Sequence, residues 1–409
     1  RHSQVRFVES MPSGDSGKVY LCTAARTPMG CFRGALSPLS AVDLGAAAAR
    51  AAIDRAGGDA SIIEEVVTGC VITAGLGQNV GRQVAIAAGV PRTVPSYTVN
   101  KVCSSSMKAL QLAARTLRVR ADADADTDRQ RTALVVGTES MSNAPFLLPR
   151  GEMPYGGGKV EDALAKDGLE DATMRCAMGL CAEKSAKDYG ITRAASDAYA
   201  VQSYKRAAEA WAKGLFKDEV VPVTVKTRRG ETVVAEDEEF RKLVEAKVPS
   251  LAPVFVKDGT GTITAANASS LNDGAVAAVI STGPLSGHVP LAEIVAFAEA
   301  SGEPVDFTVV PIDAVKKLLD QTGVRKEEVA VWEVNEAFSV TALAFIQALS
   351  LDPAKVNMKG GAVALGHPLG MSGLRIVVSL ATVLVKGELG VATICNGGGE
   401  AMAVLLRGC

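Results

Sequence analysis

Residues 360–373 have the sequence Gly-Gly-Ala-Val-Ala-Leu-Gly-His-Pro-Leu-Gly-Met-Ser-Gly, which places one imidazole among five glycines. This imidazole, His367, is one of three in the chain; His2 lies near the N-terminus and His288 in a polar turn. His367 is therefore the main candidate for a proton acceptor that works near neutral pH. The glycines indicate that backbone packs closely around the ring. A histidine satisfied by its neighbours in a strand-to-helix turn remains the alternative for these residues alone.

The overall composition is ordinary for a soluble α/β enzyme. The chain has 409 residues, a length typical of about two or three domains, and is 48% hydrophobic and 22% charged. Only 4% of residues are aromatic while 40 are glycine, which predicts an interior of small aliphatic side chains. The net charge of −2 argues against a nucleic-acid partner, which would need a basic face. No apolar run approaches the roughly 20 residues of a membrane helix, so we expect no membrane partner.

The eight cysteines follow neither a zinc-binding nor a disulfide pattern. None forms a C-x-x-C pair, and none lies at metal-ligand spacing from a histidine. Several, such as Cys70, lie in apolar runs that predict buried and reduced thiols. This usage indicates the cytoplasm or the mitochondrial matrix, and the sequence does not decide between them. The C-terminal Leu-Leu-Arg-Gly-Cys matches neither a peroxisomal nor an endoplasmic-reticulum signal.

Short aliphatic runs alternate with helical patterns, which predicts an α/β fold with a largely parallel sheet covered on both faces. The predicted strands are Val19–Thr23, Glu65–Ile72, Val94–Asn100, Thr132–Gly137, Ala275–Ser281, Ala330–Val334 and Val391–Ile394. The predicted helices are Ala41–Ala56, Met107–Val119, Ala195–Lys213, Asp313–Leu319, Ala337–Leu349 and Gly373–Val385.

The middle of the chain has a different composition. Charged helices, a Pro/Gly-rich stretch at 151–158 and an acidic run at 236–239 indicate a polar inserted domain. We therefore expect three units: an N-terminal α/β half at 1–140 and 266–290, an inserted domain at 141–265, and a C-terminal α/β half at 291–409. The alternating Ala/Asp segment Arg120–Arg129 predicts a solvated surface loop.

The two α/β halves show a hint of duplication. Each has an asparagine-led helix start, at Asn79 or Asn335, followed by small residues around a reactive type of side chain, Cys103 or His367. Two related halves that meet face to face would bring Cys103 and His367 together.

Two cysteines and an asparagine are candidates for chemistry beside His367. Cys103 precedes three serines and an apolar helix, whose dipole would lower the pKa of the thiol and make it a nucleophile. Cys395 ends a strand before Gly397-Gly-Gly399, where free backbone N–H groups suit an oxyanion hole. Asn335 follows a strand and opens a helix. A small buried side chain, a plain glycine turn and a helix N-cap remain the respective alternatives.

Taken together, four stretches resemble the motifs of the thiolase superfamily. They are Val102–Met107, Val334–Phe338, Gly360–Gly370 and Cys395–Gly399, which contain Cys103, Asn335, His367 and Cys395 in the family's order. The resemblance covers practically the whole chain, and residues 178–183 and 264–273 are similar to the short-chain, acetoacetyl-CoA branch. It implies two duplicated α/β halves that form a five-layer α-β-α-β-α core with an inserted loop domain.

The resemblance implies an acetyl-CoA acetyltransferase that condenses two acetyl-CoA molecules into acetoacetyl-CoA and coenzyme A, and the reverse thiolysis. His367 would take the proton of Cys103, whose thiolate attacks an acyl-CoA, while the N–H groups of Cys103 and Gly397 hold the oxyanion. Cys395 would then remove a proton from the methyl group of the second acetyl-CoA. Asn335, through a bound water, and His367 would stabilise the enolate.

The same resemblance suggests how substrates and subunits are bound. Residues that match coenzyme A contacts or the acyl pocket are Tyr204, Lys247, Ser269, Met178 and Phe307. A potassium ion, found in the mitochondrial branch, would be held by Tyr204, Ala265, Ala266, Ala268 and Val363, mostly through backbone carbonyls. A surface lysine at 247 and a packing tyrosine at 204 remain alternatives. The family also implies a homotetramer, a dimer of dimers with residues 141–166 as a contact.

The chain departs from the family pattern at three positions. Ala177 stands where many short-chain members have histidine, Ser106 where glycine is commoner, and Glu400 where a small residue is usual. These departures remove no catalytic group, but they leave acyl-chain selectivity and coenzyme A affinity open.

Three other functions compete with this interpretation. A 3-ketoacyl-CoA thiolase that cleaves longer chains is the nearest, although Met178 and Phe307 would crowd its acyl pocket. A ketosynthase would need a second active-site histidine, and a non-catalytic relative would be expected to lose Cys103, Cys395 or His367. A nicotinamide dehydrogenase lacks support, because we find no strand–G-x-G-x-x-G–helix unit.

Overall fold

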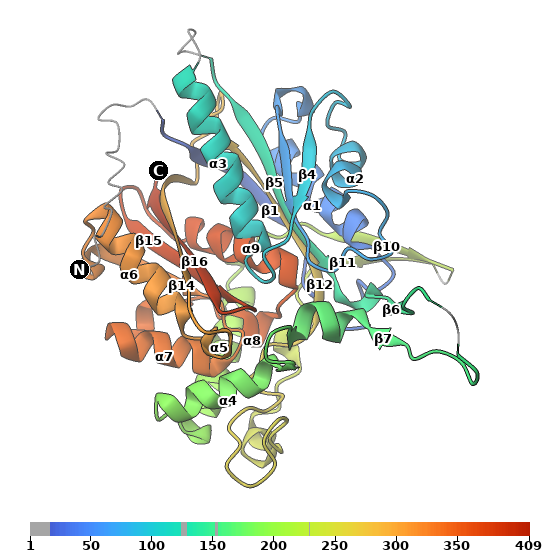
Figure 1. Ribbon diagram of the computed structural model, residues 1–409. Helices are drawn as coiled ribbons and strands as arrows, with labels where there is room; N and C mark the ends of the chain where they lie inside the picture. Colours follow the sequence, from blue (N-terminus) through green and yellow to red (C-terminus); the bar gives the residue numbers. More distant parts are fainter. Residues whose placement is uncertain (1–16, 124–128, 152–153, 229) are drawn as a thin grey trace, which may run out of the picture.

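The computed structural model describes residues 17–123, 129–151, 154–228 and 230–409, so His2 lies outside the described residues. A large mixed sheet crosses the molecule, and helices cover both of its faces (Figure 1). The strands of this sheet are β1 (Tyr20–Arg26), β2 (Gly30–Cys31), β3 (Val66–Gly69), β4 (Ser96–Val99), β5 (Thr132–Ser140), β12 (Asn272–Ser281), β13 (Ala292–Ser301), β14 (Val329–Val334), β15 (Leu389–Asn396) and β16 (Glu400–Gly408). The helices are α1 (Ala41–Arg55), α2 (Val80–Ala87), α3 (Ser105–Ala123), α4 (Met178–Asp188), α5 (Arg193–Ala212), α6 (Val310–Thr322), α7 (Ser339–Leu349), α8 (Ala362–Leu365) and α9 (Leu369–Ala381).

The sheet repeats one strand topology in its two halves. The order is β1-β12-β5-β3-β4 in the first half and β13-β16-β15-β14 in the second. In the first half, β12 pairs antiparallel with β1 on one side and with β5 on the other. In the second half, β16 pairs in the same way with β13 and β15. The next pair, β5 with β3 or β15 with β14, is parallel. The halves join where β1 pairs with β13, and the shared topology agrees with the duplication that the sequence suggested.

The expectation of a largely parallel sheet is wrong. Among the described strands of the main sheet, only β3 with β4, β3 with β5, and β14 with β15 pair in parallel. Each half instead closes with a return strand, β12 or β16, that runs antiparallel to both of its neighbours. Alternation of strands and helices indicates crossovers but not the direction of such a closing strand.

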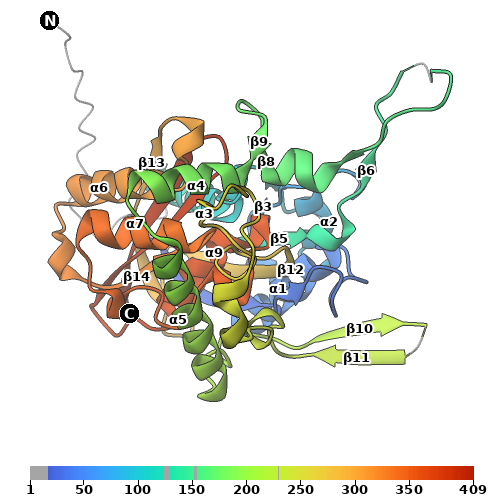
Figure 2. The same ribbon diagram turned by 90° about the horizontal axis from the view of Figure 1, so that it is seen from below.

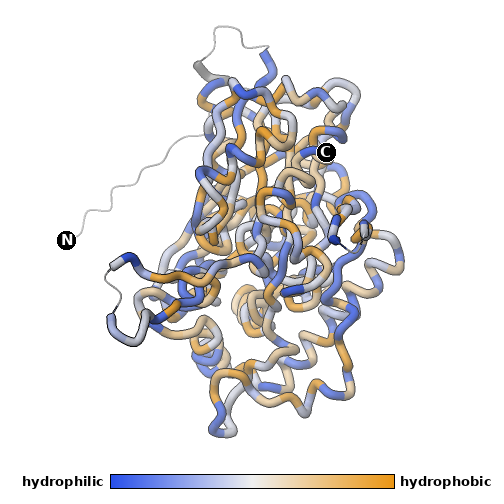
Figure 3. The backbone as a smooth tube through the Cα atoms, turned by 90° about the vertical axis from the view of Figure 1, so that its right-hand side faces the viewer, coloured by the Kyte–Doolittle hydropathy of each residue, from blue (hydrophilic) through white to orange (hydrophobic). Residues whose placement is uncertain are grey.

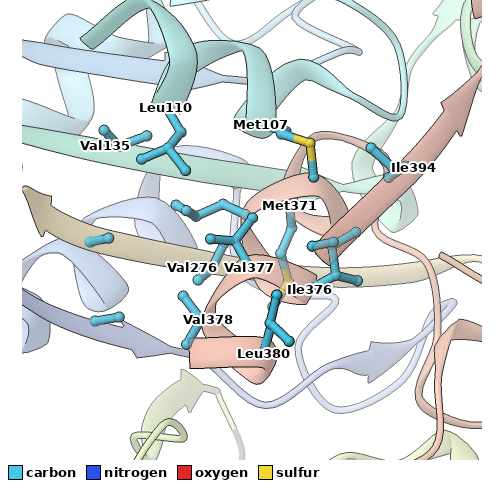
Figure 4. Close-up of a cluster of buried hydrophobic side chains, with 14 of the residues drawn as sticks. Met107, Leu110, Val135, Val276, Met371, Ile376, Val377, Val378, Leu380 and Ile394 are labelled. Atoms are coloured by element: carbon cyan, nitrogen blue, oxygen red, sulfur yellow. The ribbon is translucent and has the colours of Figure 1, made fainter. Parts of the chain in front are cut away.

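Five layers result from the way the helices pack. Helices α3 and α9 lie together between the two halves of the sheet, where Met107 and Leu110 of α3 face Met371 and Val377 of α9 (Figure 4). Helices α1 and α2 cover the other face of the first half, and α6 and α7 cover that of the second. Every residue of α9 is buried, including its polar residues Ser372, Arg375 and Ser379, as expected for a helix at the centre of a protein.

Most elements lie within a few residues of their predicted positions, with two informative differences. Strands β13 and β16 were not predicted; the burial pattern of β13 alternates along small and acidic residues, which weakens its signal. The prediction of a surface loop at 120–129 is wrong for residues 120–123, because α3 continues to Ala123. Alanine and arginine favour helix, and this outweighs the low complexity of the segment. Residues 124–128 lie outside the described residues.

The segment between β5 and β12 contains α4, α5 and three hairpins. The hairpins are β6 (Phe146–Leu147) with β7 (Glu161–Asp162), β8 (Glu170–Asp171) with β9 (Cys176–Ala177), and β10 (Val223–Thr227) with β11 (Gly230–Val234). Figure 2 shows α4 and α5 lying across one side of the molecule, while the β6–β7 and β10–β11 hairpins project from the body of the protein. Helix α5 packs against α7 and α8, so this segment lies next to the stretch that contains His367. The predicted boundaries at 141 and 265 stay a prediction.

Apolar residues are distributed along the strands and the packed helices of the body (Figure 3). Within the described residues, no helix combines the length and apolar character needed to cross a bilayer.

Candidate active site

The residues of the four motifs meet beside one cavity. Cys103 lies just before α3, and His367 lies in the short connection between α8 and α9. Asn335 follows β14, and Cys395 lies near the end of β15. A cavity of about 370 Å³ is lined by Cys103 and His367, among other residues. The fold therefore brings together residues that are up to 292 positions apart in the chain, such as Ser104 and Asn396, which are joined by a hydrogen bond.

Cys103 is a buried thiol that faces two backbone donors. The N–H groups of Gly397 and of Cys103 itself donate to its sulfur and lower the pKa of the thiol. Burial acts more strongly in the opposite direction and raises that pKa to about 12. The expected low pKa is therefore wrong for the free protein, because the loss of hydration outweighs the helix terminus. The two donors are nevertheless the ones that were predicted for an oxyanion hole.

Ser372 determines which nitrogen of His367 is basic. The Ser372 hydroxyl lies 2.6 Å from Nδ1 of His367 and also donates to the carbonyl of Pro368 at 2.9 Å. Because a carbonyl can only accept, the single hydroxyl proton points at Pro368, and Nδ1–H of the histidine must donate to Ser372. Nε2 then has the free lone pair and lies 3.5 Å from Nδ2 of Asn335. The base is the Nε2 atom.

His367 is held in its neutral form. Burial lowers the pKa of its imidazole to about 3, and the positive charge of Arg375 acts in the same direction. A neutral imidazole beside a neutral thiol is ready to accept a proton only when the sulfur attacks a substrate, so the free protein has no thiolate–imidazolium pair.

Asn335 is not a helix cap. Helix α7 begins at Ser339 with Phe338 at its N-cap position, and the Asn335 side chain points to His367 instead. Oδ1 of Asn335 is buried and has no hydrogen-bond partner among the described residues. An amide oxygen in this position is suited to hold a water molecule or a donor group of a substrate.

Cys395 is a second buried thiol close to the first. It packs in an apolar cluster with Phe307 and Phe338. Burial raises the pKa of its thiol, and the nearby Cys103 raises it further. The effect of Cys103 on this pKa shows that the two thiols are close to each other.

The backbone around His367 is shaped by one glycine. Gly366 has φ of +107°, and a Cβ at this position would lie 2.4 Å from the carboxamide carbon of Asn272. That carboxamide accepts the N–H of His367 at 3.0 Å and donates to the carbonyl of Gly30 at 3.0 Å. Asn272 therefore fixes the histidine to the first half of the sheet.

Two buried carboxylates, both missed in the sequence, join the segments around the site. Glu139 accepts the N–H groups of Val71, Ile72 and Gly370 at 2.8 to 3.1 Å, and burial raises its pKa although these donors lower it. Glu336 accepts from Tyr199, Ser203, Asn357 and Val363 at 2.8 to 3.1 Å and so joins α5 to the second half. An acidic residue at the end of an apolar strand, as Glu139 near the end of β5, is the signal that was available.

Of the predicted substrate-binding residues, three line the cavity. Met178, Ser269 and Phe307 do so, together with Phe338 and Ala177. Tyr204 is buried in the central core cluster, and Lys247 is exposed in the inserted segment. Their roles stay predictions.

The predicted potassium ligands offer free carbonyl oxygens. Ala265, Ala266 and Ala268 lie in one turn, and their carbonyl groups, like that of Val363, accept no hydrogen bond from the described residues. Tyr204 and Val363 belong to the same core cluster. Oxygen ligands of this kind are compatible with a monovalent cation such as potassium.

Ser106, one of the departures from the family pattern, has a packing role. Its hydroxyl donates to the carbonyl of Met371 at 3.1 Å and accepts the N–H of Leu374 at 2.9 Å. It therefore connects α3 to α9, the two helices that begin beside Cys103 and His367.

A thiol under two N–H donors, beside a neutral imidazole and a second thiol, defines a class of acyl-transferring enzymes that work through a covalent thioester. The comparisons with known proteins agree. Residues 19–283 match the thiolase N-terminal domain and residues 288–408 match the thiolase C-terminal domain. The chain belongs to the thiolase family.

Curated relatives and solved structures are similar over nearly the whole chain. Acetyl-CoA acetyltransferase A, mitochondrial, of Xenopus laevis is 48% identical over 95% of this chain and 92% of its own length. The mitochondrial acetyl-CoA acetyltransferase of Homo sapiens is 47% identical over 99% of this chain and 94% of its own. The crystal structure of Acat5 thiolase from Ascaris suum in complex with coenzyme A is 52% identical, has a TM-score of 0.89 and covers 96% of this chain and 100% of that one.

Proposed function

We propose that this protein is an acetyl-CoA C-acetyltransferase, which condenses two acetyl-CoA molecules into acetoacetyl-CoA and coenzyme A and catalyses the reverse thiolysis. The observation that supports this most is the convergence of the Gly397 and Cys103 N–H groups on the Cys103 sulfur. The names of the relatives support the substrate, and the coenzyme A in the Ascaris suum thiolase supports coenzyme A as the carrier.

In the first half-reaction Cys103 becomes acetylated. Nε2 of His367 accepts the thiol proton as the Cys103 sulfur attacks the thioester carbonyl of acetyl-CoA. The N–H groups of Cys103 and Gly397 hold the negative oxygen of the tetrahedral intermediate. The carbon–sulfur bond to coenzyme A then breaks, and the leaving thiolate takes the proton of Cys395. Cys103 is now a thioester, His367 is protonated and Cys395 is a thiolate.

In the second half-reaction the carbon–carbon bond forms. The Cys395 thiolate removes a proton from the methyl group of a second acetyl-CoA, and its raised pKa makes it a strong base for this step. Protonated His367, and Asn335 through a water, stabilise the enolate oxygen. The enolate carbon attacks acetyl-Cys103, whose sulfur leaves and recovers its proton from His367. Acetoacetyl-CoA is the product, and all three groups return to their first state.

The shape of the cavity favours a short acyl group. Met178, Phe307 and Phe338 line the space next to Cys103, and the volume of about 370 Å³ has to hold two acetyl units with part of the coenzyme A chain. A thiolase specific for longer chains would need further room at this place.

Three finer points are also proposals. Tyr204, Ala265, Ala266, Ala268 and Val363 would hold a potassium ion, for which the free carbonyl oxygens are the support. The protein would assemble as a homotetramer through residues 141–166, where Phe146 and Tyr155 are exposed apolar side chains. Its compartment would be the mitochondrial matrix, as the names of the relatives suggest, with the cytoplasm as the alternative.

A thiolysis assay tests the function. Acetoacetyl-CoA should be cleaved faster than a long-chain 3-ketoacyl-CoA, and potassium should raise the rate.

The Cys103→Ser variant should lose at least about a thousandfold in rate while it stays folded. The Cys395→Ala variant should form acetyl-Cys103 more slowly, because coenzyme A leaves without the Cys395 proton, and should form no acetoacetyl-CoA; mass spectrometry detects the acetylated cysteine. Faster cleavage of the long chain would exclude the proposed substrate, and activity in Cys103→Ser would exclude the nucleophile.

A further inference from the structure

The nucleophile and its oxyanion donor come from different halves of the protein. Cys103 lies before α3 in the first half, whereas Gly397 lies in the glycine turn between β15 and β16 in the second. An oxyanion donor is effective only when its nitrogen lies within about 3 Å of the developing negative oxygen. The relative position of these two segments therefore has to be fixed by contacts outside the reacting atoms.

Two side-chain contacts connect the segments, one on each side of Cys103. Ser104 donates its hydroxyl to Oδ1 of Asn396 at 2.8 Å in a buried position. Lys101 donates from Nζ to Oε2 of Glu400 at 2.7 Å. Residues 101 and 104 flank the nucleophile, and residues 396 and 400 flank the glycine turn, so the two segments are joined at both ends.

Glu400 is held from several directions. Its Oε1 accepts the Ser301 hydroxyl at 3.2 Å, and its Oε2 lies 3.5 Å from Nδ2 of Asn396. Burial raises the pKa of this carboxyl, but Lys101 and the other donors outweigh it and leave the pKa below its usual value. Glu400 is therefore charged at neutral pH. It is also a position where the chain departs from the pattern that it otherwise resembles.

Both segments contain backbone conformations that are unfavourable for most residues. Val102, next to the nucleophile, has φ of +47°, a strained value for a β-branched residue that costs on the order of 1–3 kcal/mol. Gly398 and Gly399 have φ of +87° and +80° and offer no side chain for anchoring. Local hydrogen bonds support each segment, between Val102 and its neighbours Asn100 and Ser105 in one and between Gly399 and Gly302 in the other. The contacts at the ends of the segments are the ones that join one segment to the other.

We propose that Lys101 and Glu400 are a positioning pair that holds the Gly397 N–H against the Cys103 sulfur. This role rests on the acyl transfer proposed above. The side chains of Lys101 and Glu400 are 15% and 35% exposed, and partly exposed ion pairs contribute little to global stability. Loss of the pair should therefore appear in the rate of acyl transfer and not in the unfolding equilibrium.

The test uses Lys101→Met, Glu400→Gln and the double variant in the full-length protein. Each single change should lower the rate of Cys103 acetylation by acetyl-CoA, and kcat, by about tenfold, with KM changed by less than about twofold. The double variant should be no slower than the slower single variant, because both changes remove the same contact. Lys101→Arg, which keeps the charge, should recover most of the rate.

Lys108→Met is the matched control. Lys108 lies on α3 a few residues further along and pairs with Glu299 at 2.7 Å, with 22% and 28% exposure. Glu299 also lies 3.5 Å from Nζ of Lys101, so this variant removes a neighbouring charge of the same cluster but leaves the contact between Lys101 and Glu400 in place. This variant should keep the wild-type rate. The urea midpoint of every variant should equal that of the wild type.

A second measurement separates this proposal from the proposed function. Alkylation of Cys103 by iodoacetamide needs no acyl-CoA, and it should slow in Lys101→Met and Glu400→Gln, because the Gly397 N–H also stabilises the thiolate. If the wild-type protein has no transferase activity, the proposed function is overturned. The alkylation rates of the variants still test the Lys101–Glu400 pair in that case. Wild-type rates in the single variants, additive losses in the double variant, or rate losses that follow the loss of folded protein would each overturn the positioning role.

Discussion

At the scale of the residue, His367 depends on neighbours that have no chemical role of their own. Ser372 determines its tautomer, Asn272 holds its backbone, and Arg375 adds a positive charge that disfavours a proton on the ring. Ser372 lies within the same short sequence as His367, but its function follows only from the second hydrogen bond that it makes to Pro368.

The Ser372→Ala variant tests how the tautomer is selected. Without the acceptor for Nδ1–H, the neutral ring distributes its proton over both nitrogens and Nε2 is basic only part of the time. We expect kcat for thiolysis to fall by about tenfold to a hundredfold, as for other partners that orient a catalytic histidine. Ser379→Ala, on the same helix and also buried, bonds to Glu219 instead and should keep its activity. Equal activity in both variants would contradict the role of Ser372.

Burial of neutral His367 also predicts a pH dependence of stability. The folded pKa of about 3 lies below the usual value of 6.5, so below the latter the unfolded chain binds a proton that the folded protein does not. The stability is therefore fully present above pH 6.5 and decreases as the pH falls. At about pH 5 the loss should be about 2 kcal/mol. Urea unfolding at the two pH values should show a smaller loss in His367→Gln; an equal loss would contradict the assignment.

At the scale of the element, the site is made from the ends of strands and helices. β14 and β15 run parallel and end with Asn335 and Cys395, while α3 and α9 begin beside Cys103 and His367. Elements packed in the core thus supply short connections whose positions vary little. The connection between α8 and α9 is closely packed, since a side chain at Gly366 would collide with Asn272.

Gly366→Ala should disrupt this connection. Alanine at φ +107° and ψ +164° is strained by on the order of 1–3 kcal/mol, and its Cβ would also displace Asn272 from the N–H of His367. We expect a loss of activity of more than about a hundredfold, since a displacement of about 1 Å has this effect. Gly57→Ala has nearly the same φ, +104°, but no atom within 4 Å of the new Cβ. It should lose a similar amount of stability from strain and remain active, which circular dichroism and the thiolysis assay would show.

At the scale of the whole molecule, buried charges connect the inserted segment to the sheet. Arg26 on β1 is fully buried and bonds both oxygens of Asp237 at 2.7 and 3.0 Å. Glu219 lies 3.4 Å from the same guanidinium, and Lys359 lies 3.6 Å from Glu219. The cluster thus joins three parts of the chain that surround the site.

Arg26→Met should destabilise the protein strongly. It leaves Asp237 as a buried charge without its arginine partner and Glu219 with Lys359 as its remaining ion-pair partner, which costs about 3–5 kcal/mol. Arg241→Met removes an arginine from an ion pair with Glu236 on the surface and should cost less than about 1 kcal/mol. Urea unfolding of both variants measures the difference, and similar midpoints would show that the buried cluster has no structural role.

Much of the site can be predicted from the sequence because its motifs are local. Cys103, Asn335, His367 and Cys395 each lie in a short pattern of recognisable chemistry, and most strands and helices are predicted within a few residues of their bounds. Hydrophobic periodicity and turn residues act over neighbouring positions, so such features need no knowledge of the fold.

Other properties were decided by the tertiary structure alone. The antiparallel return strands β12 and β16, the high pKa of Cys103, and Asn335 as a partner of His367 instead of a helix cap were all predicted wrongly or left open. The contact between Lys101 and Glu400 spans 299 positions. The sequence by itself determined which chemical groups are available and in which elements they lie. Only the packed molecule decided their hydration and their long-range partners, because both depend on which segments exclude water together.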